Sequence, residues 1–244
     1  MHGRERAVLD KSYKQVSLYN LKPMKTFLIA IAISAMMPVV AQNSCSQFYP
    51  TEEGKTHIIH QLDKRERLST IVEYTVTEAN NNELTIAMKL KDKREKLITE
   101  SSFKALCDGG TTRLDPESIM SAQIQQYDGM EYSITGDDIF FPNTMSVGET
   151  LPDASVTMKV DAGMMNITST VAMTDRKVAR KESVTTPAGT FDCYVITYTN
   201  TLRMGMSRTM HTTQWIAQGV GMVKEETRKS NGNLITKSVL QAIN

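Results

Sequence analysis

Apolar residues at every second position constrain the fold of this chain more than any other feature of its sequence. From about His57 onward, short apolar runs alternate with polar side chains. The clearest runs are Leu84, Ile86, Met88 and Leu90; Val156, Met158 and Val160; and Met165, Ile167, Val171 and Met173, with a gap at Ser169. Because successive side chains of a strand point to opposite faces, each run predicts a β-strand with one buried face.

The segments between these runs contain residues that favour tight turns. Examples are the asparagines at 80–82, Asp-Ala-Gly at 161–163 and Ser-Asn-Gly-Asn at 230–233. Asn-Gly tolerates the positive φ of a short hairpin turn. Short strands joined by such turns predict an antiparallel meander.

One segment has helical periodicity instead. Asp115 can cap a helix N-terminus, and Pro116 fits the first helical position. Met120, Ile124 and Tyr127 then recur at helical spacing, before an Asp-Gly pair ends the pattern. We therefore predict a mainly β (α+β) fold. It would be a curved antiparallel sheet or incomplete β-barrel, with one amphipathic helix packed on its concave side or one edge.

The N-terminal region has the three parts of a secretory signal. Lys25 follows Met24, an apolar run comes next, and the small residues Val39 and Ala41 precede a polar segment. The apolar run is too short for a membrane span, which needs ~20 residues. We expect residues 24–41 to be a signal peptide and the chain to be exported to the periplasm, the cell surface or the exterior.

Two further expectations concern the domain boundaries. Residues 1–23 lack the signal pattern, so we expect translation to begin at Met24; a genuine long n-region is the alternative. Residues 42–244 would then form a single β-rich domain, which is large enough for one core. The residues before Cys45 do not fit a lipobox, so we expect no acylation there.

The charge balance argues against nucleic acid as a partner. Of 28 basic and 27 acidic residues, 6 and 2 lie before residue 42, which leaves the expected mature chain with a net charge near −3. Such a chain has neither a basic footprint for nucleic acid nor a polybasic patch for anionic lipid.

Three cysteines remain after the expected cleavage. An exported chain meets an oxidising compartment, so we expect one disulfide among Cys45, Cys107 and Cys193, and the sequence leaves the pairing open. Three buried thiols are the alternative.

No catalytic or metal-binding pattern emerges from the residues. His57 and His60 lie three apart, on opposite faces of a strand, without other ligands at zinc spacing, and we expect both to be exposed or half-buried. His211 lies in a Thr-rich segment, and no nucleophile motif accompanies it. We expect no enzyme activity, no metal and no cofactor.

Methionine is the feature that points to a function. Of the chain's 16 methionines, 12 follow residue 41, many at predicted inward positions. Methionine is flexible and polarisable, and it suits surfaces that adapt to varied apolar partners. The candidate apolar groove between sheet and helix comprises Met120, Ile124, Met158, Met165, Met173, Met204, Met206 and Trp215. Ordinary core filling is the alternative.

Several short motifs follow one another in order. They are residues 45–50 (Cys-Ser-Gln-Phe-Tyr-Pro), 107–110 (Cys-Asp-Gly-Gly), 147–154 (Val-Gly-Glu-Thr-Leu-Pro-Asp-Ala), 187–191 (Pro-Ala-Gly-Thr-Phe), and Trp215 with 219–221 (Gly-Val-Gly). This pattern resembles the TapB-like group of exported Gram-negative bacterial proteins, a domain family of unknown function, from about Cys45 to Leu240. The resemblance implies an antiparallel, barrel-like sheet akin to periplasmic lipoprotein carriers, and it supplies no catalytic residues.

Three functions remain in competition. The first is a binding module whose groove takes a lipid, an acyl chain or a peptide. The second is a structural or interaction protein of the cell envelope, with a filled core and an envelope protein as its partner. The third is a secreted hydrolase, which would need His211 to meet a nucleophile and a carboxylate in one cleft.

Overall fold

The computed structural model describes residues 45–124, 127, 129–161, 163 and 166–244. These residues belong to one compact unit. The expected extension (1–23), the expected signal peptide (24–41) and Met165 lie outside the described residues.

Thirteen strands of the described residues form one sheet, in which every pairing of neighbours is antiparallel. The strands are β1 (Thr56–Leu62), β2 (Leu68–Ala79), β3 (Glu83–Asp92), β4 (Leu97–Asp108), β5 (Thr111–Leu114), β6 (Glu131–Gly136), β7 (Ile139–Pro142), β8 (Ala154–Asp161), β9 (Asn166–Thr186), β10 (Gly189–Met204), β11 (Met206–Ala217), β12 (Gly221–Lys229) and β13 (Leu234–Ile243). Their order is β6-β8-β9-β10-β11-β12-β13-β1-β2-β3-β4-β5-β7, so β6 and β7 are the edges of an open sheet. The prediction of a mainly β, antiparallel fold is confirmed.

The period-two runs form strands as predicted. On β8, Val156, Met158 and Val160 are buried, and the residues between them are half-buried or exposed. On β3, Leu84 and Ile86 are buried in the same way. The alternation therefore marks the face of each strand that packs into the core.

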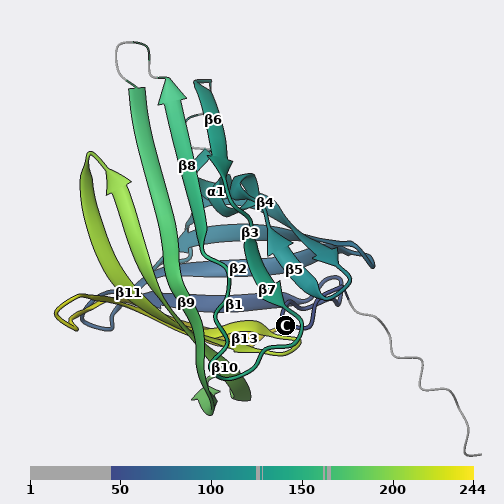
Figure 1. Ribbon diagram of the computed structural model, residues 1–244. Coiled ribbons are helices and arrows are strands. Elements are labelled where there is room, and N and C mark those ends of the chain that lie inside the picture. Colours follow the sequence, from purple (N-terminus) through teal and green to yellow (C-terminus); the bar gives the residue numbers. More distant parts are fainter. Residues whose placement is uncertain (1–44, 125–126, 128, 162, 164–165) are drawn as a thin grey trace, which may run out of the picture. The chain divides into compact units, whose positions relative to one another are not determined.

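The sheet is strongly twisted along its length. Figure 1 shows β8, β9 and β10 running steeply across the direction of β1, β2 and β3, although all six belong to the same sheet. Register shifts interrupt several pairings, including one between Val195 and Ile196 and one between Trp215 and Ile216. Such bulges bend a strand and increase its local twist, which explains how one layer can turn its apolar face inward.

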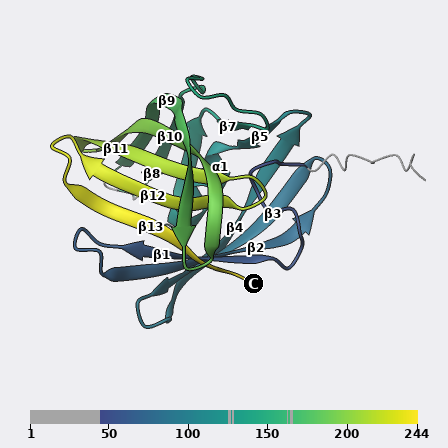
Figure 2. The same ribbon diagram turned by 90° about the horizontal axis from the view of Figure 1, so that it is seen from below.

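The far end of the β9–β10 hairpin helps to cover this face. Ala188 and Phe191 pack against the buried cluster of Ile59, Val72 and Leu240, which come from β1, β2 and β13. In the view from below, the same hairpin crosses in front of β12 and β13 (Figure 2). Residues from strands that are not neighbours in the sheet thus share one core.

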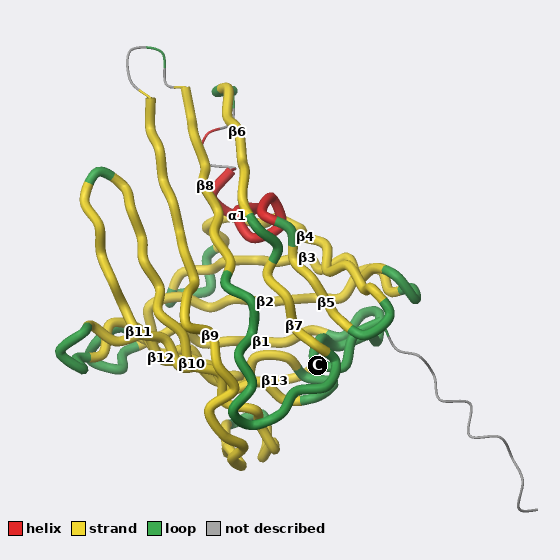
Figure 3. The backbone as a smooth tube through the Cα atoms, viewed as in Figure 1, coloured by secondary structure: helices red, strands yellow, loops and turns green. Residues whose placement is uncertain are grey.

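The predicted helix exists, but it is short and it is not amphipathic. It is α1 (Pro116–Ile124), which lies beside β4 and β6 (Figure 3). The capping prediction holds, because the Ser118 amide donates to the Asp115 carboxylate at 2.8 Å. The prediction of an amphipathic helix is wrong, because the apolar and polar residues of α1 are only weakly segregated, although Met120 and Ile124 both pack toward Val156 and Met158 on β8.

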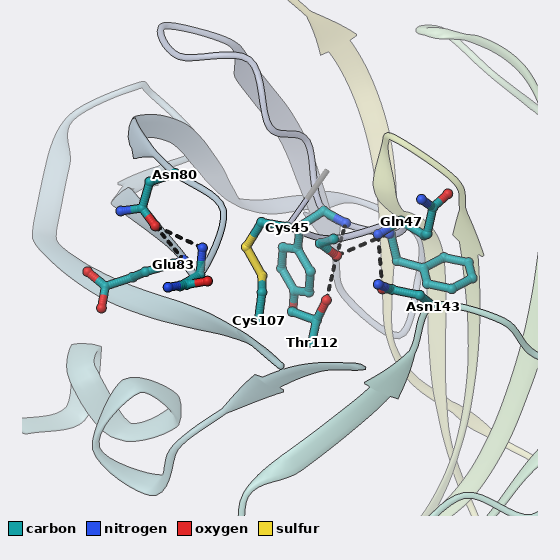
Figure 4. Close-up of a disulfide and its surroundings, with 11 residues drawn as sticks. Cys45, Gln47, Asn80, Glu83, Cys107, Thr112 and Asn143 are labelled. Atoms are coloured by element: carbon teal, nitrogen blue, oxygen red, sulfur yellow. Dashed lines mark hydrogen bonds between the residues drawn. A yellow bond between two sulfur atoms is a disulfide. The ribbon is translucent and has the colours of Figure 1, made fainter. Parts of the chain in front are cut away.

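A disulfide joins Cys45 to Cys107, which selects one of the three pairings that the sequence left open. Cys193 is a buried free thiol. The bridge ties the first described residue to the end of β4, close to Thr112 on β5 (Figure 4). It closes a loop across a sequence separation of 62 residues.

Loss of this disulfide should lower the stability of the fold. Because the bridge restricts the unfolded chain, Cys107→Ser is expected to reduce the free energy of unfolding by about 2–4 kcal/mol in urea titrations. Cys193→Ser is the matched control. A reductant should lower the stability of this variant by as much as it lowers that of the wild type. Equal stability of the wild type with and without reductant would contradict this role.

Candidate functional site

Residues 45–50, which we call the N-terminal strap, lie over the inner face of the sheet. The Ser46 hydroxyl organises the strap, because it accepts hydrogen bonds from the amides of Phe48 at 3.2 Å and Tyr49 at 3.0 Å. The Thr112 hydroxyl on β5 donates to the same oxygen at 2.6 Å. The Ser46 oxygen therefore both folds the strap back on itself and binds it to β5.

Two backbone contacts fix the other side of the strap. The Gln47 amide donates to the Asn143 side chain at 3.1 Å, and the Gln47 carbonyl accepts from the Gly219 amide at 2.7 Å. A Cβ at Gly221, whose φ is +84°, would lie 3.3 Å from the Phe48 carbonyl oxygen. The glycines of the β11–β12 turn thus give both the turn conformation and the close approach of the strap.

The aromatic side chains of the strap fill part of the space inside the sheet. Phe48 is 1% exposed and packs among Ile139, Leu151 and Ile196. Burying a phenylalanine contributes about 1.5–3 kcal/mol. Tyr49 lies between this cluster and the cluster around Leu84. The strap is therefore part of the core as well as its cover.

A cavity of about 360 Å³ remains beneath the strap. Strands β1 to β4 contribute Ile59, Tyr74, Val76, Ile86, Met88 and Phe103 to its lining. Further apolar lining comes from Leu114, Ile139, Phe141, Ile216, Val220 and Met222. Together with Phe48, Tyr49 and Pro50, these residues give the cavity a largely apolar wall.

Besides the two tyrosines, the polar side chains of the lining are His57, Ser118 and Gln214. No lining residue among the described part of the chain is an aspartate, glutamate, lysine or arginine. Burial lowers the pKa of His57, and the Lys55 charge lowers it further, so the imidazole is neutral at pH 7. Burial raises the pKa of Tyr74 to about 12, so its hydroxyl keeps its proton.

A carboxylate lies next to the cavity without lining it. Glu225 on β12 accepts hydrogen bonds from the Tyr198 hydroxyl at 3.3 Å and from the Gln214 amide at 3.0 Å. Gln214 also lines the cavity, so Glu225 holds that amide in place. Burial raises the pKa of Glu225, which means that its negative charge is disfavoured in the folded chain.

The raised pKa of Glu225 predicts a pH-dependent stability. The folded chain retains this proton at pH values where the unfolded chain has lost it, so stability falls as pH rises above the ordinary value of 4.5. Glu225→Gln should therefore stabilise the fold at pH 7 by more than at pH 4, as measured by urea unfolding. Glu52→Gln, at an exposed position, is the control. A stability difference between Glu225→Gln and the wild type that is the same at both pH values would contradict the prediction.

The structure distributes the seven described residues of the expected Met-rich groove over several places, and Met165 lies outside the described residues. Met120 and Met158 are buried in one cluster with Val156 and Val160, and Ile124 packs at its margin. Met173 packs against the cluster around Phe48, and Trp215, 5% exposed, is buried with Val195 and Val223. None of these described residues lines the cavity.

Met204 and Met206 do not line the cavity. They are 59% and 74% exposed, and they flank Gly205 where β10 turns into β11. Gly205 has a φ of +71°, which a tight hairpin turn requires. The two methionines therefore sit at a hairpin tip, exposed to solvent.

Sequence reasoning missed His57, which is 5% exposed instead of exposed or half-buried as expected. It alternates with the buried Ile59 on β1, so the period-two pattern extended by one position would have placed it on the inner face. His60 is half-buried, as expected. His211 is exposed on β11.

The described residues contain no group of three or more His, Cys, Asp or Glu side chains arranged to hold a metal ion. Within the same residues, no helix has the length and apolar character needed to cross a membrane.

Two solved structures share this fold. One is a protein classed as exported, with a YmcC-like fold, from Bacteroides fragilis; it is 21% identical, has a TM-score of 0.69, and the match covers 82% of this chain and 100% of that one. The other is a protein classed as a lipoprotein from Parabacteroides distasonis; it is 23% identical, has a TM-score of 0.67, and the match covers 82% and 99%.

Other comparisons are weaker or negative. The likeness to the lipoprotein YmcC of Escherichia coli has a TM-score of 0.33 at 10% identity, over 88% of this chain and 93% of that one. No curated protein is detectably similar to the chain.

A family model establishes the relationship at the level of sequence. The DUF3108-like model matches residues 52–240, which is most of the chain and nearly all of the described domain. The prediction that the chain belongs to a known domain family is thereby confirmed. The family model that matches is described as DUF3108-like and not as TapB-like. The chain belongs to the DUF3108-like family.

Proposed function

We propose that this chain is an exported binding protein that holds one apolar molecule, such as a lipid, an acyl chain or an apolar peptide, in the cavity beneath the strap. The cavity volume of about 360 Å³ falls within the range of 300–1,000 Å³ that is usual for ligand pockets. Its wall is mostly aromatic and aliphatic, with a few polar groups, as in pockets for small apolar ligands.

Three observations support export. Residues 24–41 have the pattern of a secretory signal. The Cys45–Cys107 disulfide is typical of proteins in oxidising compartments. Proteins with the same fold are classed as exported or as lipoproteins. The TapB-like resemblance also implies a barrel-like sheet akin to periplasmic lipoprotein carriers, and we include this expectation in the proposal.

The lining favours binding over hydrolysis. A nucleophilic hydrolase needs a serine or cysteine with a base in reach. The Ser118 hydroxyl instead donates to Asp115, the residue that caps α1, at 2.8 Å. His211 is exposed on β11 and does not line the cavity. The hydrolase anticipated around His211 therefore has little support.

A second candidate is a protein-binding role in the cell envelope. The observation in its favour is the exposed pair Met204 and Met206 at the β10–β11 tip. Solvent-exposed methionines of this kind suit contact with another protein. This role does not require a ligand in the cavity.

Binding of a hydrocarbon probe tests the leading proposal. Purified protein should increase the fluorescence of 1,6-diphenyl-1,3,5-hexatriene with saturation at one probe per chain. Val220 lines the cavity from the β11–β12 turn, so Val220→Trp should fill the space and reduce probe affinity at least tenfold.

Val147→Trp is the matched control, because Val147 is 56% exposed and lies outside the lining. It should bind the probe like the wild type, and melting curves should show that both variants fold. Absence of saturable binding, or equal binding by Val220→Trp, would reject the proposal.

A further inference from the structure

His57 is a buried polar side chain without a protein partner in the described structure. It lies on β1, opposite Tyr74 of β2, and it lines the cavity with Ile59 from the same strand. It is 5% exposed, and its Nδ1 atom has no hydrogen-bond partner among the described residues. Buried polar atoms are nearly always paired, so an unpaired nitrogen in a ring that lines a cavity points to a partner from outside the chain.

The chemistry of the ring limits that partner. Burial and the nearby Lys55 charge favour the neutral form of His57, which carries one donor and one acceptor nitrogen. A hydroxyl group, which donates and accepts, can pair with either nitrogen. Rotation of the ring about its χ2 bond exchanges the positions of nitrogen and carbon, so either nitrogen can face such a group.

The rest of the lining excludes ions. No aspartate, glutamate, lysine or arginine of the described chain lines the cavity. A carboxylate or ammonium transferred from water into such a space loses its hydration without gaining a counter-charge. The lining therefore favours a ligand whose polar end is uncharged.

We propose that His57 is the polar subsite of the cavity and that it hydrogen-bonds the uncharged hydroxyl head of an apolar ligand, in the manner of a long-chain alcohol or an acylglycerol. The apolar tail then lies among Ile59, Phe141 and Ile216. This assignment rests on the proposed function, because it names the ligand class of the same cavity.

Displacement of the hydrocarbon probe by three ligands of equal chain length tests the assignment. 1-Decanol should displace diphenylhexatriene at a lower concentration than decanoate or decyltrimethylammonium. In His57→Leu, decanol should be weaker by about three- to tenfold, which corresponds to one hydrogen bond. Affinity for diphenylhexatriene, which has no polar atom, should not fall, because leucine keeps this part of the wall apolar.

His60→Leu is the matched control on the same strand, because His60 does not line the cavity and should leave decanol binding unchanged. His57→Leu should also unfold at a higher temperature than the wild type in the absence of ligand, since it removes an unpaired buried polar atom. A second measurement avoids mutation: the imidazole ¹⁵N resonances of His57 in the wild type should shift with decanol and not with the hydrocarbon probe.

Three results would overturn the assignment while leaving the proposed function in place. They are unchanged decanol binding by His57→Leu, equal losses of decanol and hydrocarbon affinity in that variant, and His57 ¹⁵N resonances that do not shift when decanol is added. Failure of the wild type to bind diphenylhexatriene would instead reject the proposed function itself.

Discussion

A single β-sheet with one apolar face must cover that face with its own curvature or with other parts of the chain. In this protein both solutions operate. Bulges such as the one between Trp215 and Ile216 increase the twist, so β9 and β10 turn back over β13 and β1. The N-terminal strap covers another part of the inner face, and the Cys45–Cys107 disulfide holds it at one end. The stability of the fold therefore depends on contacts far apart in the sequence.

The same constraint accounts for the cavity. Short covering segments fill a curved surface incompletely, whereas a second sheet would interdigitate with the first across its whole area. Phe48 fills the space near Ile139, and Phe191 of the β9–β10 hairpin fills the space near Leu240. Between these regions a space with a largely apolar wall remains unfilled. Such a space can hold an apolar molecule. His57 adds one polar position to that wall.

Local signals in the sequence predicted the strands, the turns and the Asp115 cap, because each depends on neighbouring residues. The cysteine pairing depended on how β4 meets the strap, and no local signal encodes that contact. The abundance of flexible methionines at positions expected to face inward predicted the groove, but Gly205 between Met204 and Met206 marks a hairpin tip, where the side chains reach water. His57 was recognisable in principle from its alternation with Ile59. The cavity was not, since its lining comes from the strap, α1 and eight strands.

Ligand binding in the cavity can be seen directly in a crystal structure of the protein soaked with 10-bromodecan-1-ol, whose bromine can be located by anomalous scattering. We expect one strong bromine peak inside the cavity, with the ligand hydroxyl within hydrogen-bonding distance of the His57 imidazole. An empty cavity at saturating ligand, or a peak confined to the outer surface of the sheet, would contradict the proposal.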